Sequence, residues 1–143
     1  MEKTSQELLR SVHKNAEMGK ISIPQVLEAA EDPGLRHALH HQLREYEVIA
    51  HQSEELLERR GAPAADPGEL KEFLCGMMVR MRTMGDRSSS RLAEMMIRGS
   101  TMGTIQMARQ IHSCEAADGA ALSLAHRLLR AEERNIEELK RFL

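Results

Sequence analysis

The sequence predicts an all-α protein that forms a single four-helix bundle. Apolar residues recur at spacings of three and four, the pattern that buries one face of a helix. Capping residues, prolines and glycines divide the chain into four such segments with short linkers between them. A length of 143 residues suits one domain with one hydrophobic core.

The first helix is expected over about 5–30. Thr4 and Glu7 have the spacing of a capping box at its start. Pro24 lies inside the apolar pattern, and proline removes a backbone hydrogen bond and crowds the preceding turn. We therefore expect a kink near Gly19–Pro24 or a new helix that begins at Pro24.

The second helix is expected over about 33–60. Asp32 can cap its first turn, and Pro33 suits the first helical position because it has no N–H to leave unpaired. Gly61 is the expected left-handed residue after its last turn.

A long third helix is expected over about 67–114, where Asp66 and Pro67 mark the start. Eight of the ten methionines fall inside it, between Met77 and Met107. Asp118 opens the fourth helix, over about 119–142. An up-down-up-down order is favoured, because the linker of roughly eight residues before helix three spans at most ~28 Å, less than the ~40 Å length of helix two.

The composition argues against several classes of partner. With 20 basic and 22 acidic residues and a pI near 6.4, the chain lacks the positive excess of a nucleic-acid-binding protein. The N-terminal segment carries charges where an export signal is apolar, and no apolar run approaches the ~20 residues of a membrane span. We expect a cytoplasmic protein with no membrane partner. Cys75 and Cys114 agree with a reducing compartment, and on one straight helix they would lie nearly ~60 Å apart.

Four segments of the sequence resemble a family of small helical proteins from anaerobic Gram-positive bacteria. They are NAEMG at 15–19, QLREYE at 42–47, TMGDRSSSRLAEMMIRGSTMG at 83–103 and AEERNIEELKRFL at 131–143. The resemblance covers most of the chain. It implies a bundle loosely grouped with ferritin-like proteins, and it implies no established activity.

A polar core layer is expected from five residues on the inner helix faces: Asn15, Gln42, Ser88, Glu132 and Asn135. Because a buried polar group is costly unless it is hydrogen-bonded, we expect these side chains to satisfy one another. Such a layer can fix the register of the helices. The alternative is a metal or small-ligand site centred on Glu132.

The resemblance to ferritin-like proteins raises the question of a di-iron centre, which takes Glu from two helices and Glu-x-x-His from the other two. Here Glu132 is followed at the third position by Asn135, so an amide replaces an imidazole. No cofactor is therefore expected. The alternative is iron, manganese or zinc bound by Glu45, Glu94 and Glu132.

The histidines carry no stronger signal. His37 and His41 have the i,i+4 spacing that can chelate a metal, with His40 beside them. They fall away from the inner face on which Tyr46 lies, so we expect a solvated surface. Weak zinc binding or a bridge between two subunits is the alternative.

The spacing of Met78, Met81 and Met84 suits thioether ligands of monovalent copper. The same spacing marks an ordinary helix face, and flexible methionine fills irregular cores readily. Core packing is the favoured interpretation.

Adjacent methionine pairs indicate a different role, because neighbouring residues of a helix point to different faces. The two pairs are Met77-Met78 and Met95-Met96. We expect Met78 and Met96 to lie outside the core and to form an adaptable interaction surface. A homodimer through the third helix is the simplest partner arrangement.

Small residues in the third helix indicate close packing. Gly85, Gly99 and Gly103 are expected to permit a close helix crossing, with a hinge as the alternative. Ser88-Ser89-Ser90 is not expected to supply a nucleophile, because no histidine is placed by the sequence to activate it.

These observations favour a non-enzymatic, self-associating structural or interaction module. The alternative is a degenerate ferritin-like metal-binding or redox protein that uses core carboxylates. Copper handling through methionine and cysteine ranks third.

Overall fold

The computed structural model describes residues 2–143, which form five α-helices and no strand. The prediction of an all-α fold is confirmed, and the predicted number of four helices is wrong. The helices are α1 Glu2–Ala29, α2 Pro33–Arg59, α3 Pro67–Thr83, α4 Ser89–Ser113 and α5 Gly119–Leu139, followed by one 3-10 turn, η1 Lys140–Phe142.

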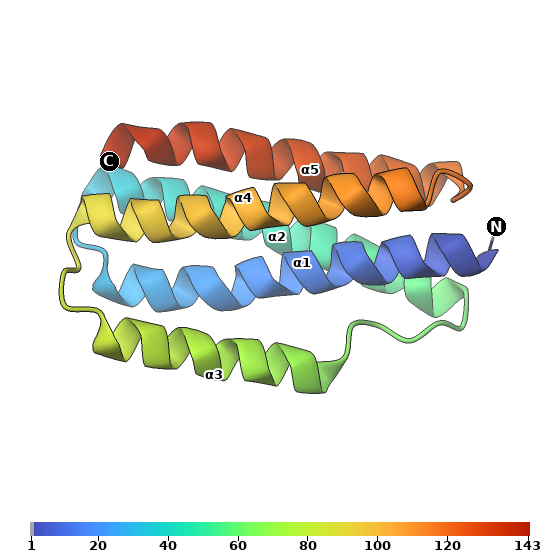
Figure 1. Cartoon of the computed structure of the whole chain (residues 1–143), viewed down its shortest axis with the longest axis horizontal. Coiled ribbons are helices and arrows are strands. Elements are labelled where there is room, and N and C mark those ends of the chain that lie inside the picture. Colours follow the sequence, from blue (N-terminus) through green and yellow to red (C-terminus); the bar gives the residue numbers. More distant parts are fainter. Residues whose placement is uncertain (1) are drawn as a thin grey trace.

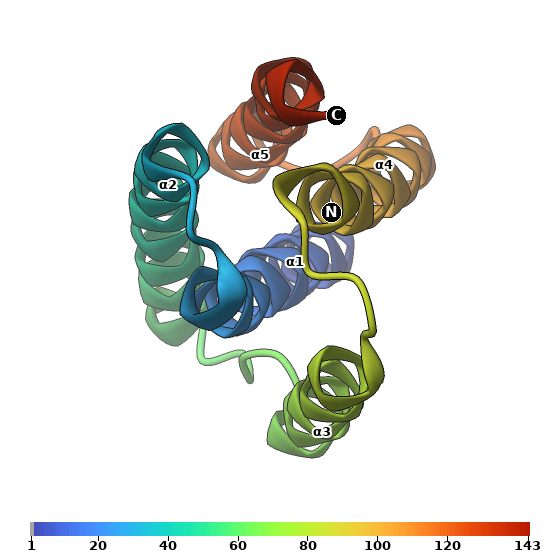
Figure 2. The same ribbon diagram turned by 90° about the vertical axis from the view of Figure 1, so that its left-hand side faces the viewer.

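Successive helices run in opposite directions along one long axis (Figure 1). An end-on view places α1 in the middle, with α2, α4 and α5 around one side of it and α3 alone on the other side (Figure 2). Consistent with this view, α3 packs on α1 and hardly approaches α4. Helix α3 is therefore an outer element attached mainly through a single neighbour.

The predicted third helix over 67–114 is wrong, because the chain breaks between α3 and α4. The Asp86 carboxylate accepts a 2.9 Å hydrogen bond from the Ser88 N–H, which forms a tight turn. Ser88 is the N-cap of α4, and its hydroxyl accepts from the Arg91 N–H at 3.3 Å. These local bonds satisfy the backbone outside a helix, so two helices replace one.

The N-terminal helix also differs from its prediction. Helix α1 is continuous from Glu2 to Ala29 and passes through Pro24, so the predicted new start at Pro24 is wrong. Thr4 lies inside the helix rather than at its cap. A single proline removes one hydrogen bond, and burial of the apolar face on both sides of Pro24 offsets this loss.

The other predicted helix ends are confirmed. Asp32, Asp66 and Asp118 each cap the helix that follows, accepting backbone hydrogen bonds of 2.9 Å from Leu35, Gly68 and Ala121 respectively. Gly61 has a φ of 64°, the left-handed conformation expected after α2.

The hydrophobic core is built from the inner faces of α1, α2, α4 and α5. Helix α3 contributes much less, because only Met77 and Met81 of its 17 residues are buried. None of the helices among residues 2–143 combines the length and the apolar character that a membrane crossing requires. The fold therefore consists of a well-packed core and one lightly attached helix.

Candidate functional site

A buried pair of polar side chains joins α2 to α5. The Tyr46 hydroxyl donates a 2.7 Å hydrogen bond to Glu132 Oε2, and Asn135 Nδ2 donates to the Tyr46 oxygen at 3.3 Å. Tyr46 and Glu132 are only 4% and 3% exposed. The sequence places all three residues on inner helix faces, and the fold brings them into contact.

Two glycines make room for this pair. A Cβ atom at Gly19 of α1 would lie 2.6 Å from the Tyr46 ring, and a Cβ atom at Gly103 of α4 would collide with the Glu132 carboxylate. The tyrosine and the carboxyl are thus packed directly against the backbones of two further helices. Gly103 permits the close approach of a side chain, rather than the helix crossing expected from the sequence.

Burial changes the acid-base properties of both groups. Removal from water raises the pKa of the Glu132 carboxyl to about 7, although contacts with the hydroxyls of Tyr46 and Ser100 act in the opposite direction. Burial, with the neighbouring carboxyl, raises the pKa of Tyr46 well above its usual value of 10. Near neutral pH the phenol therefore keeps its proton, and the carboxyl is divided between its neutral and ionised forms.

A pocket of about 310 Å³ opens beside this pair, in the space between α3 and the rest of the bundle. Tyr46 and Glu132 form its deep end. Its walls come from α1, α3 and α4 and are mainly apolar, with five methionines and one phenylalanine: Met18, Met77, Met95, Met96, Met102 and Phe73. We call this the methionine pocket.

A wider groove of about 670 Å³ lies between α3 and α4 at the mouth of the methionine pocket. Three arginines and one glutamate line it: Arg80, Arg91, Arg98 and Glu94. The two spaces are adjacent, since four residues line both: Arg80, Met95, Gly99 and Met102. We call the outer space the arginine groove.

The predicted polar core layer is only partly formed. Ser88 is exposed and caps α4, so its predicted inner position is wrong. Gln42 donates to Glu138 at 2.9 Å, and Asn15 donates to the backbone oxygen of Ser11 at 3.0 Å. The layer is therefore three separate groups rather than one network. Ser100, which is buried beside Glu132, had no distinguishing signal in the sequence.

The carboxylates of the predicted metal site do not converge. Glu45 bonds to Arg127 at 3.0 Å, and Glu94 bonds to Arg91 and Arg98, each at 2.8 Å. Among residues 2–143, no group of possible metal ligands includes either glutamate or Glu132. Since each carboxylate is satisfied on a different part of the fold, this combination cannot hold a shared metal ion.

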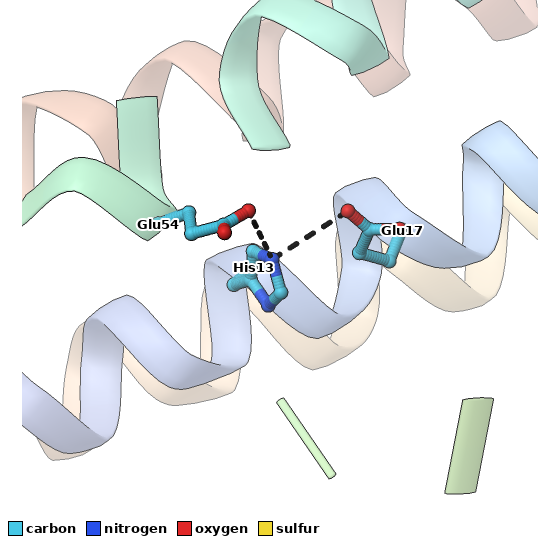
Figure 3. Close-up of side chains that lie close together, drawn as sticks. All are labelled: His13, Glu17 and Glu54. Carbon is cyan, nitrogen blue, oxygen red and sulfur yellow. Dashed lines mark ion pairs between the residues drawn. The ribbon is translucent and has the colours of Figure 1, made fainter. Parts of the chain in front are cut away.

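A cluster absent from the sequence-based predictions lies between α1 and α2. His13 Nε2 faces Glu17 Oε1 at 3.5 Å and Glu54 Oε2 at 3.8 Å (Figure 3). His13 Nδ1 accepts a 3.0 Å hydrogen bond from the Ala65 N–H. The i,i+4 spacing of His13 and Glu17 was a usable signal, whereas Glu54 joins them only through the fold.

The tautomer of His13 argues for a structural role rather than for metal binding. Because Nδ1 accepts from Ala65, its lone pair is engaged, and the neutral ring carries its proton on Nε2. A metal ion at Nε2 would move that proton to Nδ1, toward the N–H of Ala65. Burial also lowers the pKa of His13, against the influence of both glutamates. The cluster therefore fastens the 60–66 linker to α1.

The remaining candidates are mostly at the surface. His37, His40 and His41 are exposed, as expected. Met78 is 40% exposed, but Met96 is only 8% exposed and lines the methionine pocket, so its predicted place on an outer surface is wrong. Gly85 and Gly99 have no neighbour within 4 Å of an added Cβ, so neither lies at the close helix crossing expected from the sequence. Cys75 and Cys114 are both free thiols, the first exposed and the second buried.

Comparison with known proteins adds no relative. No protein-family model matches the chain, no curated protein is similar in sequence, and no solved structure is similar in fold. The resemblance to ferritin-like bundles therefore stays a prediction.

Proposed function

We propose that this protein is a non-enzymatic binding module that holds a small, mainly apolar molecule in the methionine pocket. The observation that carries the proposal is the pocket itself: about 310 Å³ of space that ends on a buried, hydrogen-bonded carboxyl. Ligand sites in proteins are typically concave and apolar, with a few well-placed polar groups. This pocket has that composition.

The lining suits an adaptable site. Methionine is unbranched and polarisable, so five methionine side chains can adjust to ligands of different shape. Helix α3 forms one wall and is held by two buried residues, Met77 and Met81. A wall with so few buried contacts separates from the core at low cost, which gives a ligand a way in.

The chemistry at the deep end supports binding rather than catalysis. Tyr46 keeps its proton at neutral pH because its pKa is raised, and its hydroxyl is already donated to Glu132. It is therefore a poor base and a poor nucleophile. Glu132 can instead recognise a ligand, since its side chain lines the pocket and its protonation state can change near pH 7.

Tyrosine fluorescence tests the proposal directly. Tyr46 is the only tyrosine and the chain has no tryptophan, so its emission reports on the deep end of the pocket. With 1-octanol as a neutral apolar probe, we expect a saturable change in emission and a higher midpoint of thermal unfolding.

The matched variants are Gly99→Phe and Gly99→Ala. An added Cβ at Gly99 meets nothing within 4 Å, so alanine fits there without a clash, and only phenylalanine is large enough to fill the pocket that Gly99 lines. Gly99→Ala should bind the probe, and Gly99→Phe should not. Equal unfolding midpoints of the two variants without the probe would show that both are folded. If both then bind the probe equally well, the probe binds outside the methionine pocket.

Self-association is a second candidate function. Four large apolar side chains are exposed on the two helices that flank the arginine groove: Met78, Val79, Met102 and Ile105. Exposed apolar groups of this kind favour contact with a second copy. Light scattering coupled to size exclusion tests this, with a dimer expected and a concentration-independent monomer as the contrary result.

A further inference from the structure

We propose that the ligand is a single-chain anionic amphiphile, whose head group binds in the arginine groove and whose apolar chain enters the methionine pocket. This inference rests on the proposed function, because it names the ligand class for the same pocket. It follows from three features of the groove: its charge, the free arginine at its junction with the pocket, and the apolar walls behind that arginine.

The groove carries an excess of positive charge. Its lining holds three arginines against one carboxylate, which leaves two positive charges at the mouth of the pocket. Glu94 is already engaged, since its two oxygens bond to Arg91 and Arg98 at 2.8 Å each. Those bonds hold the pKa of Glu94 below its usual value, so it remains ionised. The glutamate therefore fixes two arginines in place and leaves none of its own charge for a cationic ligand.

Arg80 has no carboxylate partner among residues 2–143, unlike Arg91 and Arg98, its two neighbours in the groove. It lines both the arginine groove and the methionine pocket, and it follows buried Met77 by one helical turn of α3. Its exposed guanidinium can thus bind a carboxylate or phosphate with two parallel hydrogen bonds while its stem covers apolar surface. This is the position expected for the head group of an amphiphile.

The walls behind Arg80 suit a short hydrocarbon chain. The lining of the methionine pocket is dominated by methionine and phenylalanine side chains, and its two most deeply buried polar residues are Tyr46 and Glu132. The Glu132 carboxyl already accepts the hydrogen bond of Tyr46, so a chain that ends beside the pair leaves this hydrogen bond in place. A volume of about 310 Å³ lies at the lower end of the ~300–1,000 Å³ typical of ligand pockets. A chain of medium length is therefore the expected occupant.

The test compares three probes with the same eight-carbon chain: octanoate, octylamine and 1-octanol. Their affinities are measured by calorimetry at pH 7.5 and at low and high salt. Octanoate should bind about tenfold more tightly than 1-octanol, the effect of one charge-assisted contact, and this advantage should shrink at high salt. Octylamine should bind no more tightly than 1-octanol.

The variants are Arg80→Gln and, as the control, Arg82→Gln. Both lower the charge of α3 by one, but Arg82 lines neither the groove nor the methionine pocket. Arg80→Gln should remove most of the advantage of octanoate, measured as the ratio of the octanoate and 1-octanol affinities within the same variant. Arg82→Gln should have little effect on either probe.

Two results would overturn this inference while leaving the proposed function intact. One is tighter binding of octylamine than of octanoate, which would assign the site to a cation that pairs with Glu132. The other is an equal loss of octanoate affinity in both arginine variants. If none of the three probes binds, the proposed function itself fails, and the ligand class fails with it.

Discussion

Tyr46 donates a 2.7 Å hydrogen bond to Glu132, and this single contact joins α2 to α5 through two residues that are 86 positions apart in the sequence. The same two side chains press on the backbones of α1 and α4 at Gly19 and Gly103. They also form the deep end of the methionine pocket. The pair is therefore both a packing element of the core and the polar end of the proposed binding site.

The raised pKa of Glu132 predicts that stability falls as pH rises. The pKa of this carboxyl is about 7 in the folded protein and 4.5 in the unfolded chain, so between these two pH values the native state binds more protons than the unfolded state. Stability is then greatest below pH 4.5 for this group and is lost up to about pH 7. The full loss is of the order of 3 kcal/mol.

Glu132→Gln should abolish this pH dependence, because the amide is neutral at every pH and can still accept the Tyr46 hydrogen bond. At pH 8 the variant should be more stable than the wild type, by up to about 3 kcal/mol in urea unfolding. Glu133→Gln, at the exposed neighbouring position, is the control and should follow the wild-type curve. If the free energy of unfolding changed with pH in the same way in all three proteins, the pH dependence would not come from Glu132.

Alanine substitutions should change the free energy of unfolding in opposite directions at a glycine that packs against Glu132 and at a glycine that has no close neighbour. Gly103→Ala should lower the free energy of unfolding by about 2 kcal/mol, because the new Cβ displaces the Glu132 carboxyl. Gly76→Ala, with nothing within 4 Å, should raise it by nearly 1 kcal/mol through helix propensity alone. Denaturant unfolding of both variants measures the difference, and a shift in the same direction for both would be contrary to the packing described.

A second pH effect should appear in acid and should come from Asp118. Its hydrogen bonds to Arg60 and to the Ala121 N–H lower the pKa of this carboxyl from 3.8 to about 2. A depressed pKa stabilises the fold above pH 3.8, and this contribution disappears as pH falls through about 2.

Asp118→Asn tests that contribution, because asparagine can still cap α5 but cannot form the ion pair with Arg60. The Asp118 side chain is 33% exposed, so solvent screening reduces the expected loss at pH 7 to about 1 kcal/mol. The two proteins should converge at pH 2. A difference that persists undiminished at pH 2 would assign the effect to the cap rather than to the charge.

Hydrogen exchange should distinguish α3 from the other helices. Only two of its residues are buried, whereas α1 has ten, so α3 should open without unfolding of the core. Mass spectrometry of deuterated peptides should show exchange across 67–83 well before exchange in the centre of α1. Uniform protection of both helices would remove the route by which a ligand is expected to enter.

The sequence predicted the ends of helices well where an aspartate precedes a proline or glycine. Asp32, Asp66 and Asp118 all cap as expected, because capping is a local interaction between residues two or three positions apart. The break before α4 was missed although Asp86 and Ser88 carry the same kind of signal. The helical spacing of the methionines continues through Met84, so the sequence indicated a helix where the structure has a turn before Ser89.

The site was harder to predict than the helix ends. Helical spacing placed Tyr46, Glu132 and Asn135 on inner faces, but which of them touch depends on how α2 and α5 pack. The pocket depends on α3 lying apart from α4, and that separation follows from the missed turn at 84–88. His13 shows the same limit, since one of its two carboxylates comes from a different helix.

The most direct test of the binding site is a titration with octanoate followed by methyl NMR of protein labelled at methionine. Five methionines line the pocket, while Met107 is fully buried elsewhere and Met78 is exposed outside it. We expect saturable shifts at the pocket methionines, Met77, Met95 and Met96 among them, with Met78 and Met107 unchanged. Shifts confined to Met78, or no saturable shift at any methionine, would contradict it.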